Sequence, residues 1–461
     1  MLASGCNTAL RPARVAGGGS VCDRPKVLDS GEHRSLVISY DLWQAGDEPA
    51  EAGWQRVARI AMTQPLRDYI FARVLEMTSK WMFRVTTPMV VWQMTHDERM
   101  LSAALMCLLL PGLVMELVGG IFADRYDRQQ IMAVSCIGSL ACNIVIAGLA
   151  MAGALSLPLL LGLTALYGAI NAVSHAASKT IVTAYVRKED LSTAVSLNAV
   201  VFNVAGFIGP ALAAGLIYFC GSAASYLTCA VLTLAFVLLL RRIPPPAGEG
   251  GGHHASFLGA LRDGLGHVLS VQLLMWVFIL HIGSIALTRP FVEFVPAIVH
   301  HAFNGGVREA GILLSAFGLG SIAGGLWLAG CETRSTKLAA IVLGAMPVFA
   351  GALIGILLSP SLLVALPFAA VAGFGMISRA GAIQSLLQLE SNPAYRGRIM
   401  ALHGVSFEIG CIAGALFIGH MAKATSMVLA LGTCVALLLA LWLAIRGPLM
   451  ASAEVAPSTK G

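Results

Sequence analysis

Four charged residues recur at helical spacing inside an otherwise apolar stretch of the chain. Arg73, Glu76, Lys80 and Arg84 are separated by three, four and four positions, which places them on one face of an α-helix. Three of the four charges are positive, so this face can form the wall of a basic cavity that binds an anionic or hydrogen-bonding solute. An ion-pair ladder within the helix is the other arrangement that the spacing predicts.

Polar residues interrupt three further apolar stretches in the same way. Arg289 and Glu293 stand four residues apart and are predicted to pair. In an earlier stretch Asn171, His175 and Lys179 follow each other at the same spacing, which places them on one helical face. Ionisable groups at membrane depth are costly and therefore need a partner or a function. The predicted cavity is lined by Lys80, Arg84, Asn171, His175, Arg289, Arg379 and Gln384.

Glu116 and Glu408 are the most isolated carboxylates within apolar stretches, and a carboxylate in a low-dielectric environment can take up and release a proton. We predict that they couple the chain to a proton gradient, with Glu76 and Glu293 as candidates already compensated by neighbouring cations. Structural pairing is the alternative, Glu116 with nearby arginines and Glu408 with His403 or Arg379. No GxxxxGK[ST] motif occurs, so no ATP motor and no cofactor are expected.

The ten cysteines and eleven histidines show no metal-binding spacing. Most cysteines lie inside apolar runs, where they are expected to act as small packing residues. The pairs His253–His254 and His300–His301 are expected in loops, and no metal site is predicted.

Composition places these residues in an integral membrane protein. Of 461 residues, 57% are hydrophobic and only 12% are charged, and the mean hydropathy is +0.79. So few charges cannot form the surface of a soluble protein of this length. The basic residues are scattered singly or in pairs, so no nucleic-acid partner is expected.

Twelve apolar segments, each long enough to cross a bilayer, lie between Tyr69 and Ile445, and the seventh is Leu269–Val295. They predict an all-α membrane protein with twelve transmembrane helices in two six-helix bundles. The predicted parts are an extension at 1–62 that is disordered or precedes a true start at Met62, a first bundle at 63–241, a cytoplasmic linker at 242–268, a second bundle at 269–446 and a cytoplasmic tail at 447–461.

Lysine and arginine gather in alternate loops, which predicts that those loops and both termini are cytoplasmic. The loop after the second segment contains a glycine, an acidic residue and several basic ones at close spacing, which suit a charged gate between helix ends. A turn that carries only topology-setting arginines is the alternative. The predicted gating residues are Gly120, Asp124, Arg125, Asp127 and Arg128.

This loop resembles the signature loop of the major facilitator superfamily. Arg187 to Asn198, Gly209 to Ala213 and Arg396 to Leu402 resemble its enterobactin-exporter-like branch, called transmembrane secretion effectors, and the resemblance extends over the membrane portion. Asp127 replaces a usual glycine, and Lys80 stands where relatives often carry an acid. The corresponding loop of the second half keeps Arg334 without an Asp-Arg pair.

The resemblance implies the major facilitator fold and a proton-coupled exporter, an antiporter of a siderophore, secondary metabolite or drug working by alternating access. Gly209 and Pro210 resemble an exporter motif and are expected to bend the fifth segment. The alternatives are an importer or metabolite symporter of the same fold, a lysophospholipid transporter, and a sensor. No HExxH or GxSxG motif supports an enzyme. We expect a monomeric multi-pass protein of the bacterial inner membrane, with the lipid bilayer and a small, anionic substrate as its partners.

Overall fold

Long α-helices make up the chain from Leu66 to Val455. The computed structural model describes residues 64, 66–125, 128–184, 191–243, 257–331, 334–392 and 395–455, and these contain no strand. The helices are α3 (Leu66–Thr95), α4 (Glu98–Arg125), α5 (Arg128–Met151), α6 (Leu157–Ala184), α7 (Leu191–Cys220), α8 (Ser222–Leu240), α9 (Phe257–Ser270), α10 (Gln272–Thr288), α11 (Phe291–Phe303), α12 (Val307–Ala329), α13 (Ser335–Leu358), α14 (Leu362–Glu390), α15 (Arg396–Ala424) and α16 (Met427–Val455). The predicted extension at 1–62 lies outside the described residues.

Apolar runs form helices in a bilayer because a helix satisfies its own backbone hydrogen bonds. Ten spans in the described part of the chain are long and apolar enough to cross a membrane, α10 and α11 counting as one span from Gln272 to Phe303. Helices α3 and α7 are not among the ten, and α3 carries the four charges singled out above. With these two added, the helices are consistent with the predicted twelve.

The helices form two bundles that repeat one packing plan. In the first, α4 packs on α6, α5 on α8, and α3 on α7 and α8; in the second, α12 packs on α14, α13 on α16, and α10 on α15 and α16. A glycine allows two helices to approach closely in each bundle, because a Cβ at Gly168 would collide with the Leu108 carbonyl and one at Gly373 with the Phe317 carbonyl. The chain is therefore an all-helical membrane protein with two related halves.

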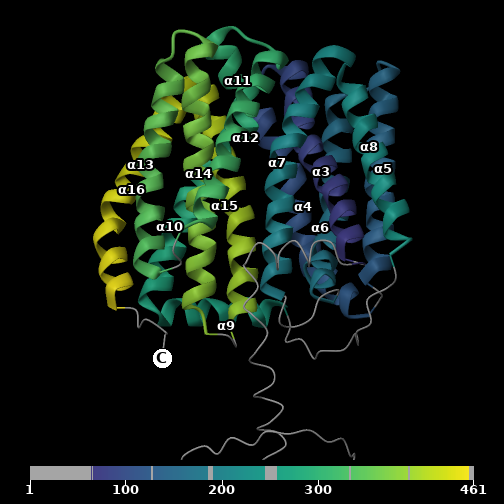
Figure 1. The fold of residues 1–461 in the computed structure, drawn as a ribbon. Helices are drawn as coiled ribbons and strands as arrows, with labels where there is room; N and C mark the ends of the chain where they lie inside the picture. Colours follow the sequence, from purple (N-terminus) through teal and green to yellow (C-terminus); the bar gives the residue numbers. More distant parts are fainter. Residues whose placement is uncertain are drawn as a thin grey trace, which may run out of the picture. The chain divides into compact units, whose positions relative to one another are not determined.

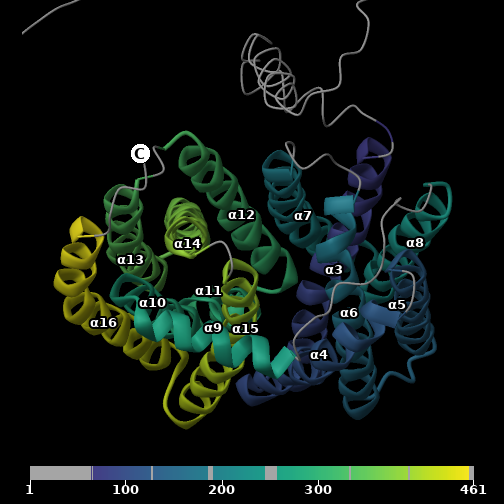
Figure 2. The same ribbon diagram turned by 90° about the horizontal axis from the view of Figure 1, so that it is seen from below.

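Different turns and helices lie at the two ends of the bundles. The upper end, at the top of Figure 1, contains the turns at 96–97, 304–306 and 425–426. The lower end contains α9, which runs beneath α10 and α15 as seen in Figure 2. Arg398 of α15 holds α9 through an ion pair of 2.9 Å with Asp263.

The bundles contact each other near the upper end. Ser102 of α4 donates a hydrogen bond of 2.6 Å to the Ala415 carbonyl of α15, and a Cβ at Gly419 would collide with the same serine. On the opposite side, Gly311 of α12 packs on Ala214 of α7 in the same way. Two pairs of helices related by the repeat therefore join the halves.

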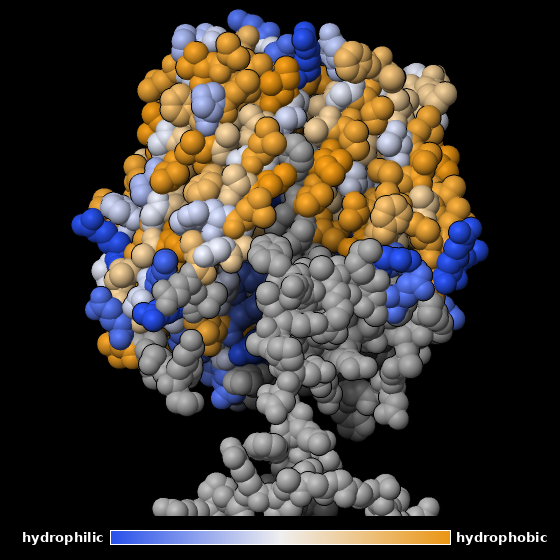
Figure 3. Space-filling model, in the orientation of Figure 1, coloured by the Kyte–Doolittle hydropathy of each residue, from blue (hydrophilic) through white to orange (hydrophobic). Residues whose placement is uncertain are grey.

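Apolar side chains occupy the outer surface of the helices. Figure 3 shows them across the middle of the face in view, with hydrophilic residues toward the upper rim and lower flanks. Leu358, Leu363 and Phe219 are between 77% and 81% exposed. Such a surface suits lipid, as the composition predicted.

Three boundaries differ from the prediction. The predicted seventh span is broken between α10 and α11, and α11 continues to Phe303, so His300 and His301 lie in its last turn and not in a loop. Pro290 stands at the break, where a missing backbone N–H is tolerated. The predicted linker includes α9, and α16 extends through much of the predicted tail.

Candidate functional site

The charged face of α3 forms an ion-pair cluster around Glu76. One carboxylate oxygen of Glu76 accepts from Arg73 and the other lies 2.6 Å from Lys80 Nζ. Arg73 and Glu76 are buried, whereas 21% of the Lys80 side chain is exposed. All three residues belong to one helix, so this Glu76 cluster confirms the ladder arrangement for the first three of the four charged residues.

The last residue of the stripe, Arg84, pairs with the other bundle. Its Nε donates a hydrogen bond of 2.8 Å to Glu293 Oε1 at the start of α11. Arg289 Nη1 lies 3.4 Å from the same carboxylate, which confirms the predicted i, i+4 pair. At 1.5 Å of rise per residue, Arg84 lies about 16 Å below the upper end of α3. This Glu293 cluster of Arg84, Arg289 and Glu293 therefore joins the two bundles near mid-depth.

Trp81 lies beside both arginines of the Glu293 cluster. Its ring centroid is 5.8 Å from Arg84 Cζ and 5.6 Å from Arg289 Cζ, within cation–π range. A Cβ at Gly209 would come within 2.6 Å of Trp81 Cβ, so this glycine allows α7 to approach α3. Gly209 and Pro210 are the residues predicted to bend the fifth segment. They lie where α7 packs against Trp81, next to the Glu293 cluster.

Arg379 lies in α14, and 2% of its surface is exposed. It donates hydrogen bonds to Ser284 Oγ and, at 3.0 Å, to Thr288 Oγ1, both in α10. No carboxylate within ion-pair distance of Arg379 occurs among the residues that the structure describes. Because hydroxyls do not neutralise a guanidinium, this site has an unmatched positive charge.

Cations outnumber carboxylates among the charged side chains described here for the interior. The Glu76 and Glu293 clusters together with Arg379 contain five cations and two carboxylates. Glu408 of α15 interacts electrostatically with Arg84, a partner that the sequence did not predict. An anionic group entering between the bundles would find arginine and lysine side chains in a low-dielectric surrounding, where charge-assisted hydrogen bonds are strong.

The other predicted cavity residues are spread more widely. Asn171 donates to Ser139 Oγ at 3.0 Å and to the Tyr167 carbonyl at 2.9 Å, within the first bundle. Gln384 is exposed on α14, below Arg379. The side chains of Glu116, His175 and the gating residues Gly120, Asp124, Arg125, Asp127 and Arg128 lie outside the described residues.

Polar side-chain contacts also join the halves at the upper end. His301 Nε2 of α11 lies 2.8 Å from Glu98 Oε1 of α4, and Lys423 Nζ of α15 lies 3.3 Å from Asp97 Oδ2. Partial burial raises the pKa of Asp97, but hydrogen bonds from the Arg99 backbone N–H and from Lys423 outweigh it and lower this pKa below 3.8. The Asp97 carboxylate is therefore charged at neutral pH and holds α15 to the turn after α3.

Three polar residues of the site were not predicted from the sequence. Ser284 and Thr288 hold Arg379, and their i, i+4 spacing was an available signal. His281 of α10 stacks on His403 of α15 with ring centroids 4.1 Å apart. Among the described residues, no group of three potential ligands could hold a metal ion.

A known protein family matches most of the chain. The profile of the family described as transmembrane secretion effector matches residues 61–460. The enterobactin exporter EntS of Citrobacter koseri is 25% identical over 389 residues, covering 80% of this chain and 88% of its own. EntS of Escherichia coli O1:K1 is 24% identical over 381 residues, with the same coverage of 80% and 88%.

Solved structures share the fold at lower identity. A bacterial homologue of the lysosomal transporter Spinster, inward-facing and unoccupied, is 18% identical with a TM-score of 0.61 and covers 85% of this chain and 95% of its own. The nucleoside transporter NupG is 14% identical with a TM-score of 0.64, covering 84% and 99%. These two similarities show the fold alone.

Proposed function

Because the chain belongs to the transmembrane secretion effector family of the major facilitator superfamily, and is thus a membrane transporter, we propose that it exports a small anionic molecule from the cytoplasm in exchange for protons. Siderophores, secondary metabolites and drugs are the substrate classes. The enterobactin exporters among its relatives favour the first class. The bilayer is that of the bacterial inner membrane.

The observation that carries this proposal is the excess of buried cations between and within the bundles. Arg379 has only hydroxyl partners among the described residues, and Arg84 and Arg289 share one carboxylate. A carboxylate or catecholate of the substrate supplies the missing negative charge, which offsets part of the cost of burying these cations. A cationic substrate would raise that cost further.

Alternating access follows from the division into two related halves. We assign the lower end, where α3 begins and α16 ends, to the cytoplasm, since lysine and arginine favour that side. The contacts between the bundles at the upper end then close the outer side. This arrangement is the one expected of a cytoplasm-facing state ready to receive substrate.

Proton coupling is assigned to Glu293 first and to Glu408 second, because both carboxylates interact electrostatically with Arg84. A proton on Glu293 removes its attraction for Arg84, so the bond that joins the bundles at mid-depth weakens. The Glu293 carboxylate and an anionic substrate would bind the same arginines, so the protonation state of Glu293 and substrate binding are linked, and the transport test below distinguishes antiport from symport. Glu76 is less suited, because both of its partners lie on its own helix.

The test uses the full-length protein in proteoliposomes that contain a catecholate siderophore on one side and an imposed pH gradient. Movement of the siderophore against the direction of proton flow supports antiport, and movement with the protons indicates a symporter instead. Arg379→Gln should reduce transport at least about tenfold, whereas Val371→Ala, at an apolar position on the same helix that is 43% exposed, serves as the control. No dependence on the pH gradient in the unmodified protein would refute proton coupling.

A further inference from the structure

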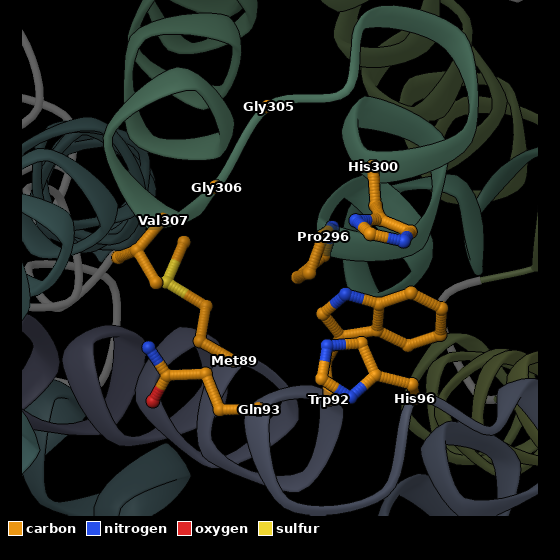
Figure 4. Close-up of a pocket in the computed structure, with 9 residues that line it drawn as sticks. All are labelled: Met89, Trp92, Gln93, His96, Pro296, His300, Gly305, Gly306 and Val307. Carbon is orange, nitrogen blue, oxygen red and sulfur yellow. The ribbon is translucent and has the colours of Figure 1, made fainter.

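A small pocket lies between the two bundles at the upper end, away from the basic interior. Its volume is about 140 Å³, and residues from both halves form its wall. Met89, Trp92, Gln93 and His96 come from the end of α3 and the turn after it, and Pro296 and His300 come from α11. Gly305 to Val307 complete the wall (Figure 4).

One side of this pocket consists of three planar rings. The Trp92 centroid is 5.5 Å from that of His96 and 5.6 Å from that of His300, with planes tilted by 57° and 64°. The two histidine rings are 5.6 Å apart. Figure 4 shows these rings facing Met89 and Val307 across the space. Tilted rings at these separations offer the edge and face contacts that a further aromatic ring prefers.

The size of the pocket sets the size of its ligand. An engineered apolar cavity of about 150 Å³ holds one benzene molecule. The ring pocket is of the same volume, so it accepts one six-membered ring and not a fused system.

The polar groups of the pocket set the charge of its ligand. The Gln93 amide and the histidine ring nitrogens can donate hydrogen bonds, and no carboxylate is among the lining residues. Two described carboxylates near the pocket already have partners: Glu309 accepts a hydrogen bond of 2.8 Å from the Gly306 backbone N–H, and Glu98 lies 2.8 Å from His301 Nε2. A hydroxyl or carboxylate substituent is therefore matched by donors, whereas an ammonium group would find only neutral acceptors, the Gln93 amide oxygen and a histidine ring nitrogen, and no carboxylate among the lining residues.

We infer that this ring pocket binds a single aromatic ring that carries hydroxyl or carboxylate groups, as a site separate from the basic interior. Because each bundle supplies part of the wall, an occupied pocket holds the upper end closed. Equilibrium binding of such a ring to the pocket does not depend on the direction of transport or on proton coupling.

The test measures binding of three probes to the full-length protein in lipid nanodiscs by titration calorimetry. Salicylate has the ring and the negative charge, cyclohexanecarboxylate has the charge without the aromatic ring, and benzylamine has the ring with a positive charge. We expect salicylate to bind at least about tenfold more tightly than either of the others. Equal affinity for salicylate and cyclohexanecarboxylate would overturn the inference.

Variants separate this pocket from the basic interior. His300→Leu and Gln93→Ala should each weaken salicylate binding about fivefold to tenfold, whereas His420→Leu, at an exposed histidine outside the pocket, should not. Binding should persist in Arg379→Gln, which alters only the interior. Loss of binding in Arg379→Gln, with full binding in both pocket variants, would assign the salicylate to the interior and refute the ring pocket.

Discussion

Replacing Glu293 by glutamine should shift the balance between the two access states of the transporter. In the structure Glu293 binds Arg84 of the other bundle at 2.8 Å and Arg289 at 3.4 Å. Glutamine keeps the shape of the side chain but removes the charge, so both arginines lose the carboxylate that binds them. The state in which the upper end is closed loses this stabilisation, because only there do the two bundles meet at this pair.

The size of the effect follows from the burial of the partners. The side chains of Glu293 and Arg84 are 1% and 18% exposed. Removing one partner from a buried ion pair costs about 3 to 5 kcal/mol. Arg84 is partly exposed and glutamine can still accept a hydrogen bond, so the lower limit applies. About 3 kcal/mol corresponds to a change of about 150-fold in the ratio of closed to open molecules.

The assay measures the distance between the bundles at the upper end. Spin labels on noncanonical amino acids at Met151 and Leu358, which are 70% and 78% exposed on different bundles, avoid the native cysteines. Pulsed electron resonance should show a longer distance population in Glu293→Gln than in the unmodified protein. Arg84→Gln should produce the same shift.

Glu76→Gln is the matched control, since Glu76 is equally buried and also holds two cations, but both lie on α3. It should leave the distance distribution unchanged although it destabilises the fold. An equal shift in the Glu76 and Glu293 variants, or no shift in either the Glu293 or the Arg84 variant, would refute the assignment of the Glu293 cluster as the link between the bundles.

Arg379, Gly209 and Asp97 carry three further predictions. Arg379→Gln should reduce transport of an anionic substrate in proteoliposomes at least about tenfold, because a charge-assisted contact is lost. Gly209→Val forces a side chain against Trp81 and should lower the free energy of unfolding by about 1 to 3 kcal/mol, measured by denaturation in detergent. Asp97→Asn removes the ion pair with Lys423 and should lower the free energy of unfolding. Folding lowers the pKa of the Asp97 carboxyl below 3.8, so this loss of stability should be constant above that pH. It should disappear as the pH falls through the lowered pKa.

One result for each of these three variants would contradict the reasoning behind it. Gly215→Val is the control for the glycine, since nothing lies within 4 Å of a Cβ there, and equal losses in both variants would contradict the packing argument. A stability difference for Asp97→Asn that persists unchanged at low pH would show that the charge is not responsible. Undiminished transport in Arg379→Gln would remove the anion-binding role of that residue.

Much of the fold could be predicted from sequence, because hydrophobic length alone identifies membrane helices. The seventh span was the exception. The predicted span ends at Val295, directly before Pro296, and proline lacks the backbone N–H that a helix interior uses. The structure includes Pro296 within α11 and breaks instead at Pro290. Two prolines six residues apart offer the same local signal, and only packing against the first bundle decides between them.

The site was predictable only where its partners are neighbours in sequence. Arg289 and Glu293 were paired by their spacing, and Glu76 was expected to be compensated by nearby cations. Arg84 and Glu293 are 209 positions apart, so no local pattern could join them. Arg379 was found as an isolated charge, but its hydroxyl partners on α10 depend on how two helices pack.

The division of the α3 charges also affects how the protein enters the membrane during synthesis. Glu76 can neutralise a neighbour within the same helix as α3 leaves the ribosome, but Arg84 finds Glu293 only after the second half has been made. A lone arginine at helix centre costs about 2.5 to 3.5 kcal/mol on insertion scales. The first bundle is thus an incomplete folding unit until α11 arrives, and a first half expressed alone would depend on chaperones or be degraded.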